Sequence, residues 1–75
     1  MRLVDAKINT TCKIVEMNIQ DEKLKFRLME LGLVANCSVK ILKKSFLKQT
    51  LLISFDASCF TLKSDIAKQI QVIYA

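Results

Sequence analysis

Apolar side chains recur at every second position in four separate stretches of this 75-residue chain. A period of two is typical of β-strands with one buried face, because successive side chains of a strand point to opposite sides. The alternating residues are Val39 and Ile41, then Leu51, Ile53 and Phe55, then Phe60 and Leu62, then Ile70, Val72 and Tyr74. Residues 12–17 break the alternation and predict a further strand with a bulge. We therefore expect a mainly β fold of about five strands, forming a small closed or half-closed barrel.

One helix is expected over about residues 21–31, where the apolar spacing changes to that of a helical face. Its core-facing residues are predicted to be Leu24, Leu28 and Leu31. Gly32, the only glycine, supplies the left-handed residue that commonly ends a helix. A shorter helix near residues 64–70 is expected to begin with Ser64 as its N-cap.

The length allows one domain, residues 1–75, whose core would be marginal. Yet 52% of the residues are hydrophobic, so either the core is unusually well filled or some apolar side chains face a partner. No secretory signal and no run of apolar residues long enough to span a bilayer are evident. The three cysteines are widely separated and read as reduced thiols, so we expect a cytoplasmic protein.

The expected helix is apolar on two faces, because Phe26 and Met29 lie nearly opposite the leucine face. Two interpretations are open. The N-terminal segment, residues 3–8, could fold over this second face, or a partner could dock there.

A basic stretch at residues 43–48 lies between two predicted strands and contains Phe46 and Leu47 beside Lys48. Such a loop could hold phosphates and stack a base in a nucleic-acid complex, and it could equally be a solvated hairpin end. The net charge of +5 suits an acidic partner, nucleic acid or an anionic membrane surface. The other basic residues are scattered without a stripe, so no nucleic-acid partner is expected.

Several kinds of active site are excluded by composition. The chain has no histidine, so the commonest general base and metal ligand is missing. Its cysteines lack Cys-x-x-Cys spacing, and a single glycine cannot form a phosphate-binding loop. We therefore predict a protein that is not an enzyme, with no catalytic residues, no metal site and no cofactor.

Residues 27–33 read Arg-Leu-Met-Glu-Leu-Gly-Leu and resemble the Arg-Leu-x-x-Leu-Gly-Leu signature of the FeoA family. Members of this family are small cytoplasmic accessories of bacterial ferrous iron transport. The other matching positions are Leu3, Ala6, Ile14, Val39, Ile41, residues 60–62, Ala67, Ile70 and Val72. The resemblance thus extends over nearly all of the chain.

The resemblance implies a Src-homology-3-like (SH3-like) barrel of about five strands with helices packed against it. It also implies direct contact with FeoB, the ferrous iron transporter with a cytoplasmic GTPase domain. No cofactor would be needed, and the protein would reach the membrane only through this partner. The expected docking residues are Phe26, Arg27, Met29, Phe46, Leu47 and Lys48. Arg27 comes from the signature and could instead form an ion pair with Asp21 or Glu30.

The chain departs from the family pattern in its turns. One family glycine is replaced by Lys48 or a neighbour, and another by Ala57. The family's Pro-Gly after the signature is Ala35-Asn36 here, and asparagine tolerates a left-handed backbone better than most residues.

Two other functions remain open at this stage, together with self-association through the surplus apolar surface. One is a small basic barrel that binds nucleic acid. The other is the C-terminal barrel of a metal-dependent repressor, which the FeoA family also resembles. The chain begins at Met1 and shows no DNA-reading helix-turn-helix, so the repressor alternative is less favoured.

Overall fold

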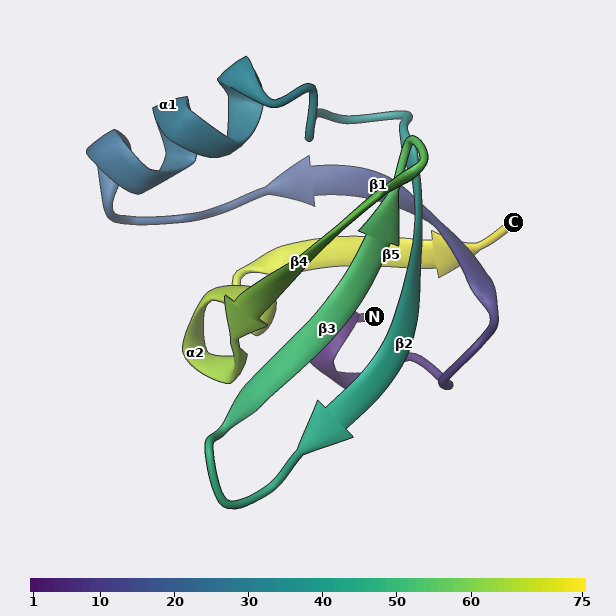
Figure 1. The fold of residues 1–75 in the computed structure, drawn as a ribbon. Helices are drawn as coiled ribbons and strands as arrows, with labels where there is room; N and C mark the ends of the chain where they lie inside the picture. Colours follow the sequence, from purple (N-terminus) through teal and green to yellow (C-terminus); the bar gives the residue numbers. More distant parts are fainter.

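Five antiparallel strands, two α-helices and one short 3-10 helix make up the computed structural model, which describes residues 1–75 (Figure 1). The elements in chain order are η1 (Leu3–Asp5), β1 (Thr11–Met17), α1 (Glu22–Glu30), β2 (Ser38–Ser45), β3 (Thr50–Phe55), β4 (Ser58–Lys63), α2 (Ser64–Ala67) and β5 (Ile70–Tyr74). The mainly β class, the strand count and the position of the longer helix are confirmed.

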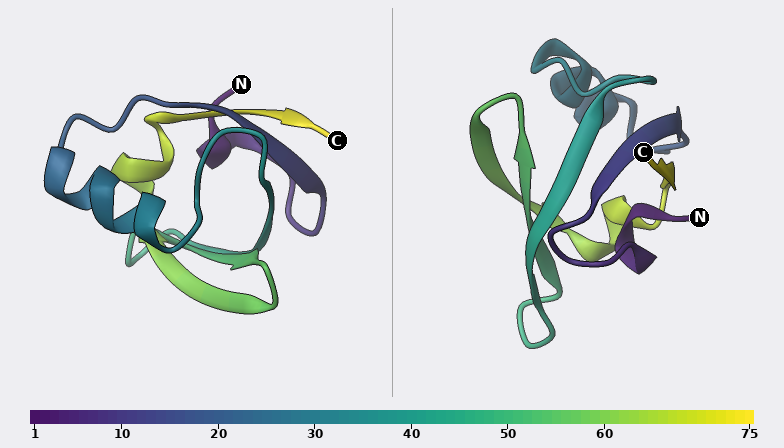
Figure 2. Two further views of the ribbon diagram at one scale, coloured as in Figure 1. Left: turned by 90° about the horizontal axis from the view of Figure 1, so that it is seen from above. Right: turned by 90° about the vertical axis from the view of Figure 1, so that its right-hand side faces the viewer.

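The strands form one sheet in the order β4-β3-β2-β1-β5, which curls around a common core (Figure 2). Tight turns join β2 to β3 and β3 to β4, and α2 carries the chain from β4 to β5. The predicted bulge in β1 is confirmed, since its pairing with β5 shifts between Ile14 and Glu16. A second shift, between Ile41 and Lys43 of β2, was not predicted. Bulges increase the local bend of a strand, which helps a five-stranded sheet to curl.

The core consists only of apolar residues, and no polar or charged residue is buried. Its sixteen members are Leu3, Ala6, Cys12, Ile14, Met17, Ile19, Leu28, Leu33, Val39, Ile41, Leu51, Ile53, Leu62, Ala67, Ile70 and Val72. Most inward positions of the sequence alternation are therefore confirmed. Phe55 and Phe60 are only partly buried against this core. Tyr74 lies exposed at the end of β5, where its hydroxyl accepts a hydrogen bond from the Lys7 amide at 3.1 Å.

Both ends of helix α1 are capped by hydrogen bonds. At its N-terminus the Asp21 carboxylate accepts a hydrogen bond from the Leu24 amide at 3.2 Å. At its C-terminus the Gly32 amide donates to Met29 and the Leu33 amide to Leu28, which is the Schellman arrangement. Gly32 has a φ of 99°, as its predicted role requires.

Leu31 was predicted to lie in the core and does not. It is the C-cap residue, and its side chain is 63% exposed. The reversal of the chain at Gly32 places the next residue, Leu33, in the core instead, where it is fully buried. Of the three predicted leucines, Leu28 is buried and Leu24 is partly buried against the core.

The short helix α2 is present but differs from the expectation. It covers only four residues, and Ile70 already belongs to β5. Ser64 is its first helical residue, while the N-cap position is Lys63, whose side chain makes no capping hydrogen bond. The predicted N-cap was therefore wrong by one residue, because β4 continues through Lys63 and the helix begins directly after it.

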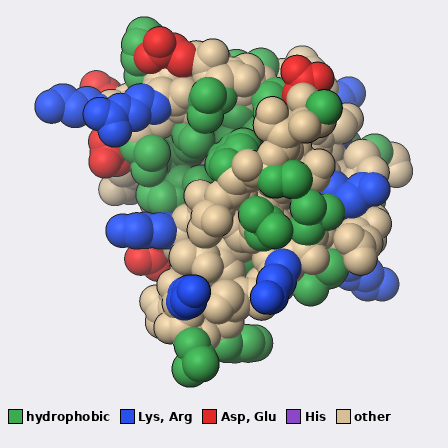
Figure 3. Space-filling model, viewed as in Figure 1, with side chains coloured by type: hydrophobic (Ala, Val, Ile, Leu, Met, Phe, Trp, Pro, Cys, Tyr) green, Lys and Arg blue, Asp and Glu red, His purple; other side chains and the backbone are tan.

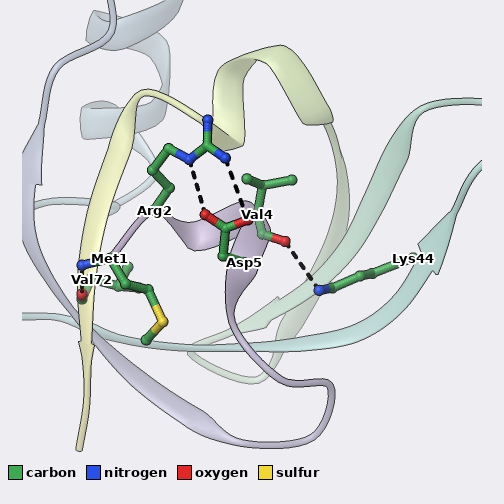
Figure 4. Close-up of polar contacts among 6 residues, drawn as sticks. All are labelled: Met1, Arg2, Val4, Asp5, Lys44 and Val72. Atoms are coloured by element: carbon green, nitrogen blue, oxygen red, sulfur yellow. Dashed lines mark hydrogen bonds and ion pairs between the residues drawn. The ribbon is translucent and has the colours of Figure 1, made fainter.

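The N-terminal segment is pinned to β5 and β2, as Figure 4 shows. Met1 exchanges two backbone hydrogen bonds with Val72, at 3.1 and 2.7 Å. The Lys44 ammonium donates to the Val4 carbonyl at 3.0 Å. These contacts hold the segment against β5 and α2, so it does not cover the second apolar face of α1.

An ion pair within this segment makes its stability depend on pH. The Arg2 guanidinium donates to the Asp5 carboxylate at 2.9 Å, and this hydrogen bond lowers the pKa of Asp5. A lowered pKa means that the contribution is present at neutral pH and is lost as the pH falls through the folded-state pKa. For Asp5→Asn we expect faster amide exchange at Ala6 at neutral pH. This difference from the parent should vanish in acid, and a difference that persists there would contradict the assignment.

The turn between β3 and β4 is formed without glycine. Asp56 and Ala57 have φ values of 50° and 65°, so both central residues are left-handed, as in a type I′ turn. Because alanine is strained there, Ala57→Gly is expected to stabilise the protein by about 0.5–1 kcal/mol. The measurement is urea unfolding, with Ala35→Gly as the control at ordinary backbone angles, where glycine should destabilise. Loss of stability in Ala57→Gly would contradict the turn assignment.

Candidate partner-binding surfaces

The six predicted docking residues fall into two groups that lie at opposite ends of the molecule. Phe26, Arg27 and Met29 are on α1, whereas Phe46, Leu47 and Lys48 lie in the turn between β2 and β3. Figures 1 and 2 both place α1 at one end and this turn at the other. The two groups therefore form separate candidate surfaces on a molecule that measures 27 × 25 × 23 Å.

The first surface is apolar and slightly hollowed, and we call it the α1 patch. It consists of Val15, Phe26, Met29 and Val34, all of which are exposed. Phe26 is 64% and Met29 45% exposed, so neither is buried beneath another segment of the chain. Figure 3 shows hydrophobic side chains gathered next to α1. The sequence analysis did not identify Val15 and Val34 as exposed. For Val15 the predicted bulge could have indicated exposure, because an extra residue in a strand turns a side chain outward.

Two shallow depressions meet at Met29. One, of about 330 Å³, is lined by five apolar and three polar residues, which are Val15, Met17, Met29, Val34, Ala35, Glu16, Asn18 and Lys25. The other extends past Phe26 to Ile19. Lys25 borders both of them. Glu16 lines the first depression and Glu22 the second, so an apolar side chain of a partner could bind on either side of Met29 with charges of both signs at the rim.

Arg27 lies on the charged border of the α1 patch. It lines a depression next to Phe26 together with Glu22 and Glu30. The two ion pairs of the structure are Arg2–Asp5 and Lys68–Asp65, so Arg27 pairs with neither Asp21 nor Glu30. Its guanidinium can therefore bind an acidic group of a partner.

The second surface is the hairpin tip, residues 46–49. Phe46 and Leu47 are 97% and 99% exposed, the largest values among the bulky apolar residues. The turn is closed by a hydrogen bond from the Gln49 amide to the Phe46 carbonyl at 3.3 Å. Gln49 has a φ of 51°, so the neighbour of Lys48 adopts the backbone for which the family uses glycine. The hairpin thus forms despite the missing glycine.

The chain shows no arrangement suited to holding a metal ion, since no three His, Cys, Asp or Glu residues come together. Burial raises the pKa of the Cys12 thiol, which keeps it protonated in the core. Cys37 is half-buried, and its thiol donates to the Val34 carbonyl at 2.8 Å. None of the helices has the length and apolar character needed to cross a membrane.

Comparison with protein families gives a match over nearly the whole chain. The FeoA domain model matches residues 1–74. A candidate Fe(2+) transport protein A from Campylobacter jejuni is 36% identical over 72 residues, which cover 96% of this chain and 96% of that protein.

Solved structures share the fold. The FeoA protein of Chlorobium tepidum superimposes with a TM-score of 0.89 at 23% identity, covering 99% of this chain and 70% of the other. The small SH3-like fold is thereby confirmed. A manganese-dependent transcriptional repressor gives a TM-score of 0.88 at 15% identity, and this chain spans 41% of its length. At such identities the likeness concerns the fold, which therefore does not by itself distinguish transport from repression.

Proposed function

The chain belongs to the FeoA domain family, whose members are accessories of ferrous iron transport, and from that premise we propose that it acts by direct contact with a FeoB-type transporter. In this proposal the protein works in the cytoplasm, by binding and not by catalysis. The observation that carries the proposal is the α1 patch, an apolar surface that no other part of the chain covers.

Exposure of this apolar patch to water is unfavourable in free energy, and binding of a partner would bury it. Apolar surface gains free energy when it is buried, at roughly 25 cal/mol for each Å². Exposed apolar side chains grouped around a depression are typical of protein–protein contacts, whereas isolated ones need no explanation. Phe26 and Met29 lie on adjacent turns of α1, so one partner surface can contact both.

The rim of the patch indicates which partner surface would fit. Lys25 and Arg27 place positive charge on α1, and Arg27 is free of any ion pair within the chain. Glu16, Glu22 and Glu30 line the same depressions, so the rim carries both signs of charge. A complementary surface would carry an apolar side chain at its centre and a carboxylate placed opposite Lys25 or Arg27. We propose that the transporter presents such a surface on its cytoplasmic side, close to or within its GTPase domain.

Of the two surfaces, the α1 patch is the better candidate for the transporter contact. It is hollowed and broad, with apolar residues from β1, α1 and the segment that follows α1. The hairpin tip protrudes and exposes only Phe46 and Leu47, beside Lys48. A hollowed surface can exclude water around a partner side chain, which is where binding energy concentrates.

The test is binding of the chain to the detergent-solubilised transporter, with and without guanine nucleotide. Phe26→Ser/Met29→Ser is expected to weaken binding by at least about tenfold, since two apolar contacts are lost. Phe46→Ser/Leu47→Ser is the matched control, with the same kinds of change at the opposite end, and should bind like the parent. Both pairs of side chains are exposed, so circular dichroism should show folded variants. Absence of binding in every nucleotide state, or loss only in the hairpin variant, would overturn the assignment.

A further inference from the structure

The hairpin tip is the most exposed apolar feature of the molecule, and the proposed transporter contact does not use it. Phe46 and Leu47 are almost entirely free of contacts with the rest of the chain. The turn that carries them is held in shape by the Gln49 to Phe46 hydrogen bond and by a second one from the Lys48 amide to the Ser45 hydroxyl at 3.4 Å. Two bulky apolar side chains are thus presented on a protruding, ordered turn.

The charge around this tip is strongly one-sided. Lys43 and Lys48 border one depression next to the hairpin, and Lys44 and Lys68 border another that reaches Phe46. Lys63 of β4 is paired with Thr50, at the start of β3. Two acidic residues lie near these lysines. Asp65 pairs with Lys68 at 3.8 Å, and Asp5 lies near Lys44, whose ammonium donates to the adjacent Val4 carbonyl. Lys44 and Lys68 therefore already have partners, whereas Lys43, Lys48 and Lys63 form no ion pair. The net charge around the tip is positive, whereas the surface of α1 mixes both signs.

We propose that the hairpin tip binds directly to an anionic phospholipid membrane, with Phe46 and Leu47 inserted among the lipid headgroups. Apolar side chains that enter the headgroup boundary combine with basic residues at the surface to hold a protein on a membrane. The lysines have long apolar stems, so they can keep their charges at the phosphates while the tip enters more deeply. A protruding tip fits this soft surface better than it fits a protein groove, because it offers little area for a rigid partner.

Because the two surfaces lie at opposite ends of the molecule (Figure 1), binding of the hairpin tip to a membrane leaves the α1 patch accessible. With the hairpin tip at the membrane, α1 would lie at the end of the molecule remote from the lipid, because the two elements are at opposite ends (Figure 2). Both surfaces could then be engaged at the same time. The inference goes beyond the proposed function, in which the protein reaches the membrane through the transporter alone.

The experiment uses vesicles without any transporter, so its failure is distinct from failure of the proposed function. The probe is vesicles of equal parts phosphatidylcholine and phosphatidylglycerol, compared with vesicles of pure phosphatidylcholine. We expect binding to the anionic vesicles that is at least about tenfold tighter and that weakens with added salt. Phe46→Ser/Leu47→Ser should weaken binding to the anionic vesicles by at least about tenfold. Phe26→Ser/Met29→Ser is the matched control and should bind them as the parent does.

Insertion can be followed at the tip itself, because the chain contains no tryptophan. Phe46→Trp is expected to show a blue-shifted emission on anionic vesicles and quenching by brominated lipid chains, whereas Phe26→Trp should show neither. Unchanged binding of Phe46→Ser/Leu47→Ser to anionic vesicles would mean that only the lysine charges hold the protein on the lipid, and would overturn the proposal. Equal binding to both kinds of vesicle, or to neither, would also overturn it. If the parent does not bind vesicles and the hairpin variant loses binding to the solubilised transporter, the tip contacts a protein and the membrane proposal is wrong.

Discussion

Replacing Ile53 by alanine is expected to destabilise the protein by about 2–5 kcal/mol, because a large buried side chain is removed and a cavity is left. Ile53 is fully buried in β3, and its neighbours across the sheet are Ile41 of β2 and Phe60 of β4. A chain of this length has a total stability of only about 4–11 kcal/mol, from roughly 0.05–0.15 kcal/mol per residue. The melting temperature should therefore fall by about 10 °C or more.

Urea and thermal unfolding of the purified variant measure this loss. Ile73→Ala is the matched control, since Ile73 lies in β5 with its side chain half-exposed. It should cost less than about 1 kcal/mol. Equal losses in the two variants would mean that the inner and outer faces of the strands are not as the structure has them.

Replacing Gly32 by valine is expected to destabilise the protein by about 2–3 kcal/mol, because a β-branched residue is strongly disfavoured at positive φ. The backbone here has a φ of 99°, and a Cβ atom would lie 3.3 Å from the Phe55 ring. Strain at this point opposes the turn that ends α1 and that directs Leu33 into the core. The α1 patch should be disturbed as well, so transporter binding should weaken together with stability.

The matched control for Gly32→Val is Gly32→Asn. Both changes place a Cβ next to Phe55, but asparagine tolerates left-handed backbone far better. A smaller loss of stability for asparagine would attribute the difference to the backbone angle. Equal losses would attribute the effect to crowding against Phe55 and contradict the role given to φ.

The strands could be predicted from the sequence because the pattern that identifies them is also the pattern that builds the core. Val39 and Ile41 are two positions apart in β2, Ile53 is two positions from Leu51 in β3, and all are buried. Residues 12–17 lacked strict alternation, and β1 does contain a bulge there. Asn36, in place of a family glycine, has a φ of 76°, which its short polar side chain tolerates.

Predictions at the ends of elements were less successful, because a helix end depends on hydrogen bonds that periodicity does not describe. Leu31 continues the spacing of the leucine face and is nevertheless exposed, since the Schellman turn begins there. Ser64 resembles an N-cap, but the N-cap position is occupied by Lys63, the last residue of β4. In both cases the residue type favoured one position, but the adjacent turn or strand fixed another.

The candidate surfaces could be predicted only in part. That Phe26 and Met29 share a face of α1 follows from helical spacing, and their exposure resolves the alternative in favour of an uncovered face. The distance between this face and the hairpin tip depends on the curl of the whole sheet, which no short-range pattern encodes. Val34 gave no signal at all, because it follows the helix in an irregular segment.

Direct contact between the α1 patch and the transporter is the central claim, and site-specific photocrosslinking in intact membranes tests it most directly. The chain would carry p-benzoylphenylalanine at Phe26, and in a control at Lys7, an exposed residue between η1 and β1. Upon illumination of membranes that contain the transporter, we predict a covalent adduct of the two proteins from the label at Phe26 and none from the label at Lys7. No adduct from Phe26, or equal adducts from both positions, would contradict the claim.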